Sequence, residues 1–378
     1  MREIRMVDLK GQYEKIKPEI DQAMNEVIES TAFINGPAVK HFATNLENYL
    51  GVKHVIPCGN GTDALQVALM ALDLKPGDEV ITSTFTFIAT AEVIALLQLK
   101  PVLVDADPDT FNIDPNKVEK AITDKTKVII PVHLFGQTSD MDRIMNIAKE
   151  HKLSVIEDSC QAIGAKYSSN GGNTMQAGTI GHMGCTSFFP SKNLGAFGDG
   201  GAVFTNDEHL AEKLRAIVNH GSFKKYYHDY VGVNSRLDSL QAAILNVKLK
   251  YLDDYIAARQ KAAQFYDQRL GDCSRLKVPA RTAFSTHVFH QYTLTLDSAV
   301  DRDAMQQFLK EHKVPAMVYY PVPLHLQKAY REEGKTEGTM PVAEDLAGRV
   351  ISLPMHTELD ENQLDYICKK VIEYLDKN

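Results

Sequence analysis

The first apolar pattern in the chain has helical spacing. Between residues 13 and 28, apolar side chains recur every three or four residues, which places them on one face of a helix. They are Tyr13, Ile16, Ile20, Ala23 and Val27. A turn-rich stretch, residues 31–37, comes next. The sequence therefore predicts an amphipathic helix near the N-terminus that ends before this turn.

Further along, short β-rich runs alternate with helix-like segments. The runs are residues 80–82, 102–104, 128–130, 155–156 and 202–204. This alternation is typical of an α/β domain with a mostly parallel sheet. We predict such a domain, the larger of two, over residues 1–250.

The last third of the chain has a different pattern of apolar and polar residues. The patterns predict a half-exposed strand at 292–296, helices near 303–312 and 361–375, and short strands near 316–320 and 350–353. They indicate a smaller α+β domain over residues 251–378. An apolar face that continues from Leu237 to Leu270, with Gly271 as its stop, predicts one long helix joining the two domains.

Composition narrows the class of protein. The 378 residues are 44% hydrophobic and 24% charged, with a formal charge of −8, as in ordinary globular domains. No apolar stretch reaches the ~20 residues that span a bilayer, and the N-terminus lacks the apolar core of a signal peptide. We therefore expect a cytoplasmic protein with no membrane segment. Lysine and arginine are dispersed, so no basic stripe indicates nucleic acid as a partner.

Neither the cysteines nor the acidic residues predict a metal site. The five cysteines are scattered and include no C-x-x-C pair, which favours reduced thiols in the core or in loops. The acidic tract 105–109 directly follows an apolar run, so we interpret it as a turn after a strand. We expect no bound metal.

The glycine-rich stretch 178–201 carries the most candidate chemistry. It places Ser187, Ser191 and Lys192 next to aromatic residues. A lysine between an apolar run and a glycine-rich loop is partly removed from water, which lowers its pKa and frees the amine to attack a carbonyl. The alternative is an ordinary surface charge. Lys192 is the candidate nucleophile.

A second candidate lies at the end of the predicted strand 155–156. Asp158 follows this strand, and Gln161 comes three residues later. Parallel sheets bind ligands at the carboxyl ends of their strands. The carboxylate either forms a turn or keeps a pyridinium nitrogen protonated, which is what makes pyridoxal phosphate an electron sink.

A third candidate is the loop 58–62, which leads into a helical pattern. Gly61 and Thr62 would lie at a helix N-terminus, where free backbone N–H groups favour a phosphate. The stretch matches neither a P-loop nor a dinucleotide fingerprint. Phe85 and Phe87 follow the next strand and either belong to the core or stack on a flat ring. Together with the lysine and the acid, these features indicate pyridoxal phosphate as cofactor.

Over nearly its full length the sequence resembles the sugar aminotransferases of the DegT/DnrJ/EryC1/StrS family. The matching motifs are NGTDAL (60–65), GDEV (77–80), ED with Gln161 (157–161), SFFPSKNLG (187–195), GDGG (198–201) and GVNSRLD with QAA (232–243). The resemblance implies the aspartate-aminotransferase-like, type I fold of pyridoxal phosphate enzymes. It also implies transamination, because the sugar 3-dehydratases of the family have histidine in place of Lys192.

The resemblance assigns a role to each candidate. Lys192 would carry the cofactor as a Schiff base, and Asp158 would pair with its pyridine nitrogen. Gln161 would lie near the ring hydroxyl, and Phe87 would stack on the ring. L-Glutamate, the usual donor in the family, would supply the amino group.

The resemblance further implies a homodimer with shared active sites. Members of the family build each site at the interface between two subunits. The phosphate would be bound by Gly61, Thr62 and Ser187 of one subunit and by Asn234 of the other.

Within the family, the likeness is greatest to enzymes that aminate UDP-2-acetamido-2-deoxy-3-oxo-glucuronate for bacterial surface polysaccharides such as lipopolysaccharide O-antigen. The cues lie at residues 220–222, 231–236, 320–324 and 352–356. The residues implied to contact the nucleotide sugar are Thr31, Phe33, Ser191, Arg236, Tyr319 and Tyr320. A planar arginine suits a carboxylate or a pyrophosphate. That subgroup would have histidine at the position of Tyr319.

Two alternatives remain open. The substrate could be a dTDP-3-keto or 4-keto-6-deoxy sugar, because Arg236 could equally bind the pyrophosphate that all of these substrates share. In a different class, the chain could be a non-catalytic regulator that binds the cofactor or a nucleotide sugar. The intact Lys192, Asp158 and Gln161 favour catalysis. No role for His133, His182 or His220 follows from the sequence.

Overall fold

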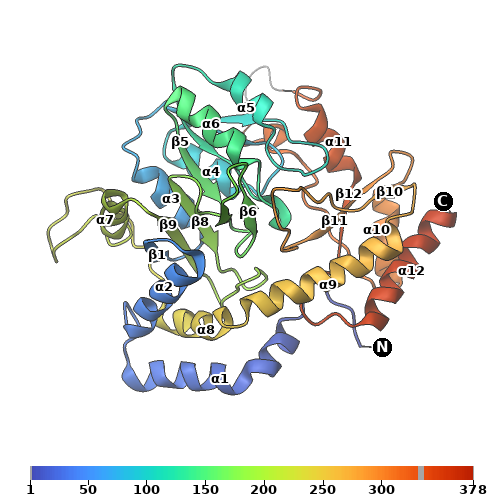
Figure 1. Ribbon diagram of the computed structural model, residues 1–378, viewed down its shortest axis with the longest axis horizontal. Helices are drawn as coiled ribbons and strands as arrows, with labels where there is room; N and C mark the ends of the chain where they lie inside the picture. The colour runs from blue at the N-terminus through green and yellow to red at the C-terminus, as the bar shows by residue number, and fades with distance from the viewer. Residues whose placement is uncertain (1, 331–335, 378) are drawn as a thin grey trace.

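The computed structural model describes residues 2–330 and 336–377. At its centre lies a seven-stranded sheet in the order β1-β9-β8-β5-β4-β2-β3 (Figure 1). Strands β8, β5, β4, β2 and β3 are mutually parallel, whereas β9 is antiparallel to both of its neighbours. The strands are β1 His54–Cys58, β2 Glu79–Ser83, β3 Lys100–Val104, β4 Thr126–Ile130, β5 Ser154–Asp158, β8 Met183–Ser187 and β9 Gly201–Thr205. The predicted α/β class is confirmed.

Two strands of this sheet were not predicted. Strand β1 lies just before the third candidate loop, and β8 lies inside the stretch interpreted as a glycine-rich loop. Gly184 explains the second case, because a Cβ atom there would lie 2.0 Å from the carbonyl oxygen of Gly178. The glycine therefore allows close packing within a strand.

Helices pack on both faces of the sheet. Apolar side chains of α3, α4 and α7 cover one face, and those of α2, α5, α6 and α8 cover the other. The helices are α2 Pro37–Leu50, α3 Gly61–Met70, α4 Ala89–Leu96, α5 Pro115–Ala121, α6 Met141–His151, α7 Glu208–Ile217 and α8 Ser239–Leu249. Because both faces are covered, the strand ends are where polar side chains can gather.

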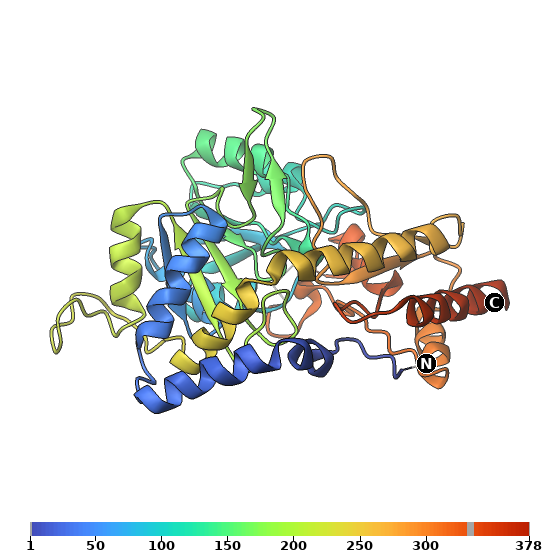
Figure 2. The ribbon, with the colours of Figure 1, turned by 60° about the horizontal axis from the view of Figure 1, so that its bottom comes forward.

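The predicted N-terminal helix is present as α1, Leu9–Ser30, and it packs along α8 (Figure 2). The predicted long helix is wrong in one respect. It is divided into α8 and α9, Leu252–Leu270, by Lys250 and Tyr251. At this break the Tyr251 hydroxyl donates a hydrogen bond to Glu19 of α1. Asp253 and Asp254 follow in the first turn of α9, where negative charge is favourable.

A second core lies between α9 and the C-terminal part of the chain. It is built on the three-stranded antiparallel sheet β10-β11-β12, with helices α10 and α12 against it. The elements are β10 Leu276–Lys277, β11 Tyr292–Leu296, β12 Val350–Leu353, α10 Arg302–Glu311, α11 Pro341–Arg349 and α12 Glu361–Lys377. The domain boundary between residues 250 and 251 stays a prediction.

Two expectations for this region are wrong. Strand β11 is buried along its whole length, because it is the central strand of its sheet and pairs on both edges. Thr293 avoids an unpaired buried hydroxyl by bonding to Ser352 Oγ at 2.8 Å. The strand expected at 316–320 is only a single bridge between Met317 and Ser352.

Short elements complete the fold. A two-stranded hairpin, β6 Lys166–Ser168 and β7 Thr174–Gln176, and the short 3-10 helices η1 Leu134–Gly136 and η2 Leu324–Leu326 lie in the connections. In the acidic tract, Asp105 accepts hydrogen bonds from the N–H groups of Val342 and Ala343 at 3.0 and 2.8 Å. Its carboxylate therefore holds the start of α11.

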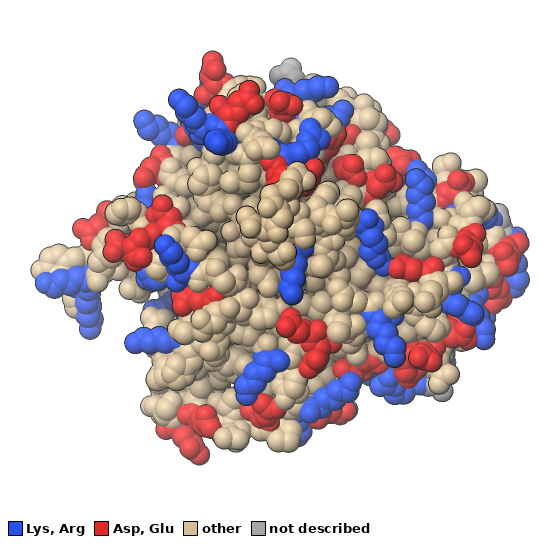
Figure 3. Space-filling model, in the orientation of Figure 1, with Lys and Arg blue, Asp and Glu red and all other residues tan. Residues whose placement is uncertain are grey.

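The surface carries both signs of charge. On the face shown in Figure 3, basic and acidic side chains are interspersed, without a continuous basic tract. Among the helices of residues 2–330 and 336–377, none combines the length and apolar character needed to cross a bilayer. The five cysteines are free thiols.

Candidate active site

Most of the predicted site residues line one cavity of about 780 Å³. It opens where β5 and β8 end, beside the N-terminus of α3. The sequence-predicted residues in its wall are Gly61, Thr62, Phe87, Asp158, Gln161, Ser187, Ser191, Lys192, Tyr319 and Tyr320. A volume of this size suits a cofactor and part of a substrate.

Asp158 is fixed at the last position of β5. Its Oδ2 atom accepts a hydrogen bond from Thr90 Oγ1 at 2.7 Å, and its Oδ1 atom accepts one from Cys160 N at 3.2 Å. The residue is 5% exposed. The carboxylate is therefore held in one orientation before any ligand binds.

Support for Asp158 comes from its neighbour on the same strand. Ser139 N donates to His133 Nδ1 at 3.2 Å, so the ring proton is on Nε2 and is donated to Glu157 Oε2 at 2.8 Å. Glu157 also accepts from the N–H groups of Gly178, Ile180 and Gly181. His133 is thus a structural residue of this strand end. His182 is structural too, because its Nδ1 accepts a hydrogen bond from Val155 N at 3.0 Å.

Gln161 is held by two partners from distant parts of the chain. Its Oε1 accepts from Phe135 N at 2.8 Å, and its Nε2 donates to the Tyr320 hydroxyl at 3.2 Å. Burial raises the pKa of Tyr320, so the hydroxyl stays protonated. The Tyr320 ring lies 6.2 and 6.3 Å from the rings of Phe85 and Phe87.

Lys192 lies in a turn that follows β8. Its backbone N–H donates to Phe189 O at 2.9 Å, and the next residue, Asn193, donates its amide to Val288 O at 2.9 Å. Removal from water lowers the pKa of the Lys192 amine, and the nearby Asp158 carboxylate opposes this effect. The environment therefore favours the neutral, nucleophilic form more than open solvent does.

A buried lysine fastens the same turn from α8. Lys248 is 2% exposed, and its Nζ donates a hydrogen bond to Gly195 O. Burial, with Arg259 nearby, lowers the pKa of Lys248 to about 7. Gln241, also on α8, accepts a hydrogen bond from Phe197 N at 2.8 Å. The segment after Lys192 is therefore tied to one helix at two points.

The N-terminus of α3 forms a narrow cradle. Asn60 caps the helix by accepting from Asp63 N at 2.8 Å. A Cβ atom at Gly61 would lie 2.6 Å from Ser187 Cβ and 3.1 Å from Cys160 Sγ, so only glycine fits. The first N–H groups of a helix have no intrahelical partner and favour an anion.

These groups fit pyridoxal phosphate. The α3 N-terminus and the Ser187 hydroxyl match the phosphate, Asp158 matches a protonated ring nitrogen, and the Lys192 amine matches the aldehyde. Phe87, 53% exposed in the cavity wall, presents an uncovered ring for stacking.

Four predicted residues do not line this cavity. Thr31, Phe33 and Asn234 are exposed, and Arg236 lines a separate groove of about 400 Å³ together with Lys40 and Arg215. Near Asn234, His220 has a positive φ of 60° and accepts a hydrogen bond from His228 at its carbonyl. A single chain therefore brings together one part of the predicted site and leaves the other part on its surface.

Several residues in or next to the cavity were not predicted from the sequence. Thr90 donates a hydrogen bond to Asp158, and Cys160, Asp199 and His290 line the same cavity as Asp158 and Lys192. Burial raises the pKa of Cys160 well above that of a free cysteine, so its thiol is protonated. The position of Cys160, two residues after Asp158, was a signal for it. Thr90 and His290 gave none, because helix α4 and the loop before β11 supply them from far away in the sequence.

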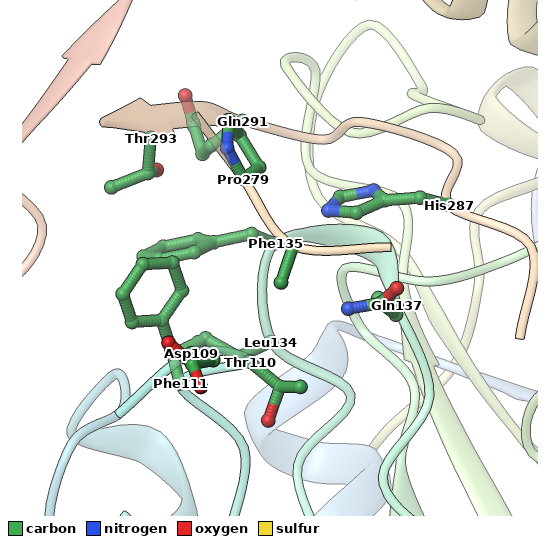
Figure 4. Close-up of a pocket in the computed structure, with 11 residues that line it drawn as sticks. Asp109, Thr110, Phe111, Leu134, Phe135, Gln137, Pro279, His287, Gln291 and Thr293 are labelled. Carbon is green, nitrogen blue, oxygen red and sulfur yellow. The ribbon is translucent and has the colours of Figure 1, made fainter. Parts of the chain in front are cut away.

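A second, much smaller cavity, drawn in Figure 4, shares Phe135 with the wall of the first. Its volume is about 10 Å³, roughly the space of one water molecule. Phe111, Phe135 and Gln137 form its wall, and His287 lies at one side in Figure 4. Gln291 lines both cavities.

Comparison with known proteins extends these observations. The DegT/DnrJ/EryC1/StrS aminotransferase family matches residues 14–372. A Geobacillus stearothermophilus protein named as a pleiotropic regulatory protein is 51% identical over 98% of both chains. The UDP-2-acetamido-2-deoxy-3-oxo-D-glucuronate aminotransferase of Pseudomonas aeruginosa is 46% identical over 97% of this chain and 98% of its own.

Solved structures agree. The crystal structure of a DegT/DnrJ/EryC1/StrS aminotransferase from Brucella abortus superposes with a TM-score of 0.93 and is 40% identical. The match covers 98% of this chain and 99% of the other. The similarity therefore extends over both the large sheet and the C-terminal core.

Proposed function

Because this chain belongs to the DegT/DnrJ/EryC1/StrS aminotransferase family, we propose that it transfers an amino group from L-glutamate to UDP-2-acetamido-2-deoxy-3-oxo-glucuronate. The reaction class is nucleotide-sugar transamination with pyridoxal phosphate, and structures with this fold include forms with pyridoxal and pyridoxamine phosphate. The observation that carries the proposal is the juxtaposition of Lys192, Asp158 and the α3 N-terminus in one cavity. The product would serve bacterial surface polysaccharide synthesis in the cytoplasm.

The chain's own residues supply binding and proton transfer. Gly61, Thr62 and Ser187 would hold the phosphate, and Phe87 would cover one ring face. Bound pyridoxal phosphate supplies an electron sink for the bond that breaks at the donor α-carbon. Asp158 would keep a proton on the ring nitrogen, which strengthens that sink.

Lys192 performs the proton transfers. The lowered pKa leaves a larger share of Nζ unprotonated, so the amine can accept a proton from the donor α-carbon. The same Nζ then delivers a proton to the cofactor carbon C4′, which completes the transfer of the amino group from the donor. When the ketosugar binds, Lys192 carries out the reverse transfer at the carbon that becomes the amine centre.

We further propose a homodimer in which Asn234, Arg236, Thr31 and Phe33 of one subunit complete the cavity of the other. The proposal is supported by the placement of these residues outside the cavity of their own chain. The segment 223–231 exposes apolar rings, with Phe223, Tyr226 and Tyr227 at 57, 81 and 62% exposure. Figure 2 shows it extending from the body beside α7. Exposed aromatic side chains in a cluster are typical of an interface.

The choice of sugar rests on the Pseudomonas relative, because the planar donors of Arg236 suit a uronate carboxylate and a pyrophosphate alike. Relatives named as dTDP-sugar transaminases keep a 6-deoxy ketosugar as the alternative. Parallel assays with glutamate should show amination of the keto-uronate at least about tenfold faster than that of dTDP-3-keto or 4-keto-6-deoxy sugars. Faster amination of a 6-deoxy sugar would reject the uronate.

A regulatory role is the second candidate. It is favoured by the name of the Geobacillus relative, which is 51% identical. A regulator needs ligand binding but not the amine of Lys192, so it predicts no release of 2-oxoglutarate from glutamate. Measured turnover that disappears in Lys192→Ala would favour the enzyme, and binding without turnover in the wild-type protein would favour the regulator.

A further inference from the structure

His290 lies in the wall of the Lys192 cavity, and its side chain makes no hydrogen bond to any residue that the structure describes. It belongs to the loop that leads into β11, and it is 8% exposed. Its Nδ1 atom is buried without a partner, and Nε2 bonds to no residue among 2–330 and 336–377. Buried polar groups are normally paired, so an unpaired one at a binding cavity points to a ligand.

The two ring nitrogens differ in what they can reach. Nδ1 is enclosed by protein that offers it no acceptor. Nε2 is not among the buried unpaired atoms, so it is the nitrogen that reaches the cavity surface. A proton on Nδ1 would have no acceptor there, whereas a proton on Nε2 can be donated to a group in the cavity. The ring therefore presents an N–H donor toward the ligand.

The charge state agrees with this geometry. Burial, together with the positive charges of Lys192 and Arg259, holds the pKa of His290 well below its ordinary value. Arg259 lies behind the loop and donates to Phe289 O and Met355 O at 3.0 Å each. The imidazole is thus neutral, and it adds no positive charge that would oppose protonation changes at Lys192.

Arg236, which the proposed dimer would bring to this cavity, is assigned above to the sugar, so a carboxylate next to Lys192 must find its partner within the chain itself. Among the described residues that line it, Lys192 is the one basic side chain besides His290, and it is needed for proton transfer. An amino-acid donor carries its α-carboxylate on the same carbon that gives up a proton to Lys192. That carboxylate must therefore lie next to Lys192. His290 lines the same cavity and is close enough to Lys192 for the two side chains to interact electrostatically.

Resting on the proposed function, we propose that His290 Nε2–H donates a hydrogen bond to the α-carboxylate of the amino donor. The residue is a donor-binding residue and leaves nucleotide recognition to other parts of the site. Its unpaired state in the ligand-free fold follows from this role, since the partner arrives with the substrate. Because the fold itself gains no hydrogen bond from the imidazole, an apolar ring of similar shape should be tolerated.

The test separates the two half-reactions by stopped-flow absorption. Glutamate is mixed with the pyridoxal form, and the ketosugar is mixed with the pyridoxamine form. His290→Phe should slow the glutamate half-reaction at subsaturating glutamate by about tenfold or more, with a raised Kd for glutamate, and change the ketosugar half-reaction less than about threefold. His290→Gln, whose Nε2 lies near the lost N–H, should recover most of the rate.

The matched control is His287→Asn. His287 is also buried, but it faces the small cavity of Figure 4 and accepts a hydrogen bond from Phe289 N at 3.0 Å, which asparagine can replace. This variant should leave both half-reactions unchanged. The thermal midpoint of His290→Phe without substrate should equal or exceed that of the wild type.

Two results would overturn the proposal. Equal slowing of both half-reactions by His290→Phe would assign the residue to the placement of Lys192, and an unchanged glutamate half-reaction would leave it no role in donor binding. If wild-type protein itself fails to react with glutamate, the donor named under the proposed function is wrong. The role of His290 in binding that donor is then rejected as well. The wild-type trace therefore distinguishes the two failures.

Discussion

The wall around Lys192 and the surface around Arg236 are built in opposite ways. Asp158 and Gln161 each make two hydrogen bonds before any ligand is present. Asn234 is exposed, Arg236 makes no hydrogen bond to a residue of the described chain, and the adjoining segment 223–231 exposes aromatic rings. The side chains of the first region are held by hydrogen bonds within the chain, whereas the second region has the features of a surface that binds a partner.

This difference indicates that the two regions have separate roles. Groups that must keep a fixed geometry for proton transfer and ring binding come from strand ends, where the sheet holds them rigidly. Groups proposed to recognise the nucleotide sugar come from the surface of a second copy. Catalysis would then depend on dimer formation, although each chain contains its own lysine.

The largest effect should come from combining a variant of the Lys192 wall with a variant of the Arg236 surface. Lys192→Ala should lower turnover by at least about 10³-fold because the proton-transferring amine is lost. The double variant that carries both Asn234→Ala and Arg236→Ala should also be nearly inactive. If the site is shared, refolding the two variants together should restore about a quarter of wild-type activity, since random pairing gives one intact site in half of the dimers. A mixture as inactive as its components would contradict the shared site.

Asp158→Asn tests the rigid side alone. The amide keeps the shape and can still bond to Thr90, but it cannot hold a proton on the ring nitrogen. We expect kcat to fall by about 10²–10³-fold, the order seen when one preorganised electrostatic partner is removed. Steady-state kinetics with cofactor in excess measure this, and a loss that extra cofactor repairs would mean that Asp158 serves binding only.

Lys248 offers a pH-dependent test of how the Lys192 turn is held. Its pKa is about 7 in the folded protein against an ordinary value of 10.5. Between these values the unfolded chain binds more protons than the folded one, so this group makes the free energy of unfolding rise with pH. The slope should approach ~1.4 kcal/mol per pH unit above pH 7.

Lys248→Met should remove that slope. Urea unfolding of both proteins between pH 6 and 10 measures it, with Lys250→Met on the exposed neighbouring position as control. Parallel curves for Lys248→Met and the wild type would show that Lys248 stays charged in the folded state.

The smallest effect should come from Tyr320→Phe. This change removes one hydrogen bond to Gln161 but keeps the ring against Phe85 and Phe87. A neutral hydrogen bond contributes about 1 kcal/mol, so kcat/KM should fall about fivefold. A loss comparable to that of Asp158→Asn would instead place the Tyr320 hydroxyl in contact with the reacting atoms.

The rigid side of the site was readable from the sequence, since its residues follow strands and lie in motifs. Asp158, Lys192 and Gly61 are examples. Their partners were not readable, because Thr90 lies 68 positions from Asp158 and His290 lies even farther from Lys192 along the chain. Hydrogen bonds between distant segments leave no local pattern.

Contacts between distant segments also limited how much of the fold could be predicted from the sequence. Apolar periodicity predicted most strands of the large sheet but extended one helix through Tyr251, because the stripe itself continues across the break. The hydroxyl contact to Glu19 that accompanies this break depends on how α1 packs on α8. The half-exposed pattern of β11 likewise included Thr293, whose buried hydroxyl pairs with Ser352 of the neighbouring strand.

The most direct test of the central claim, that Lys192 carries pyridoxal phosphate and exchanges an amino group there, is the visible absorption spectrum of the purified protein. We predict a band from the lysine-linked cofactor that glutamate bleaches and UDP-2-acetamido-2-deoxy-3-oxo-glucuronate restores, and that is absent from Lys192→Ala. A wild-type protein without such a band after addition of pyridoxal phosphate, or a band that persists in Lys192→Ala, would contradict the account.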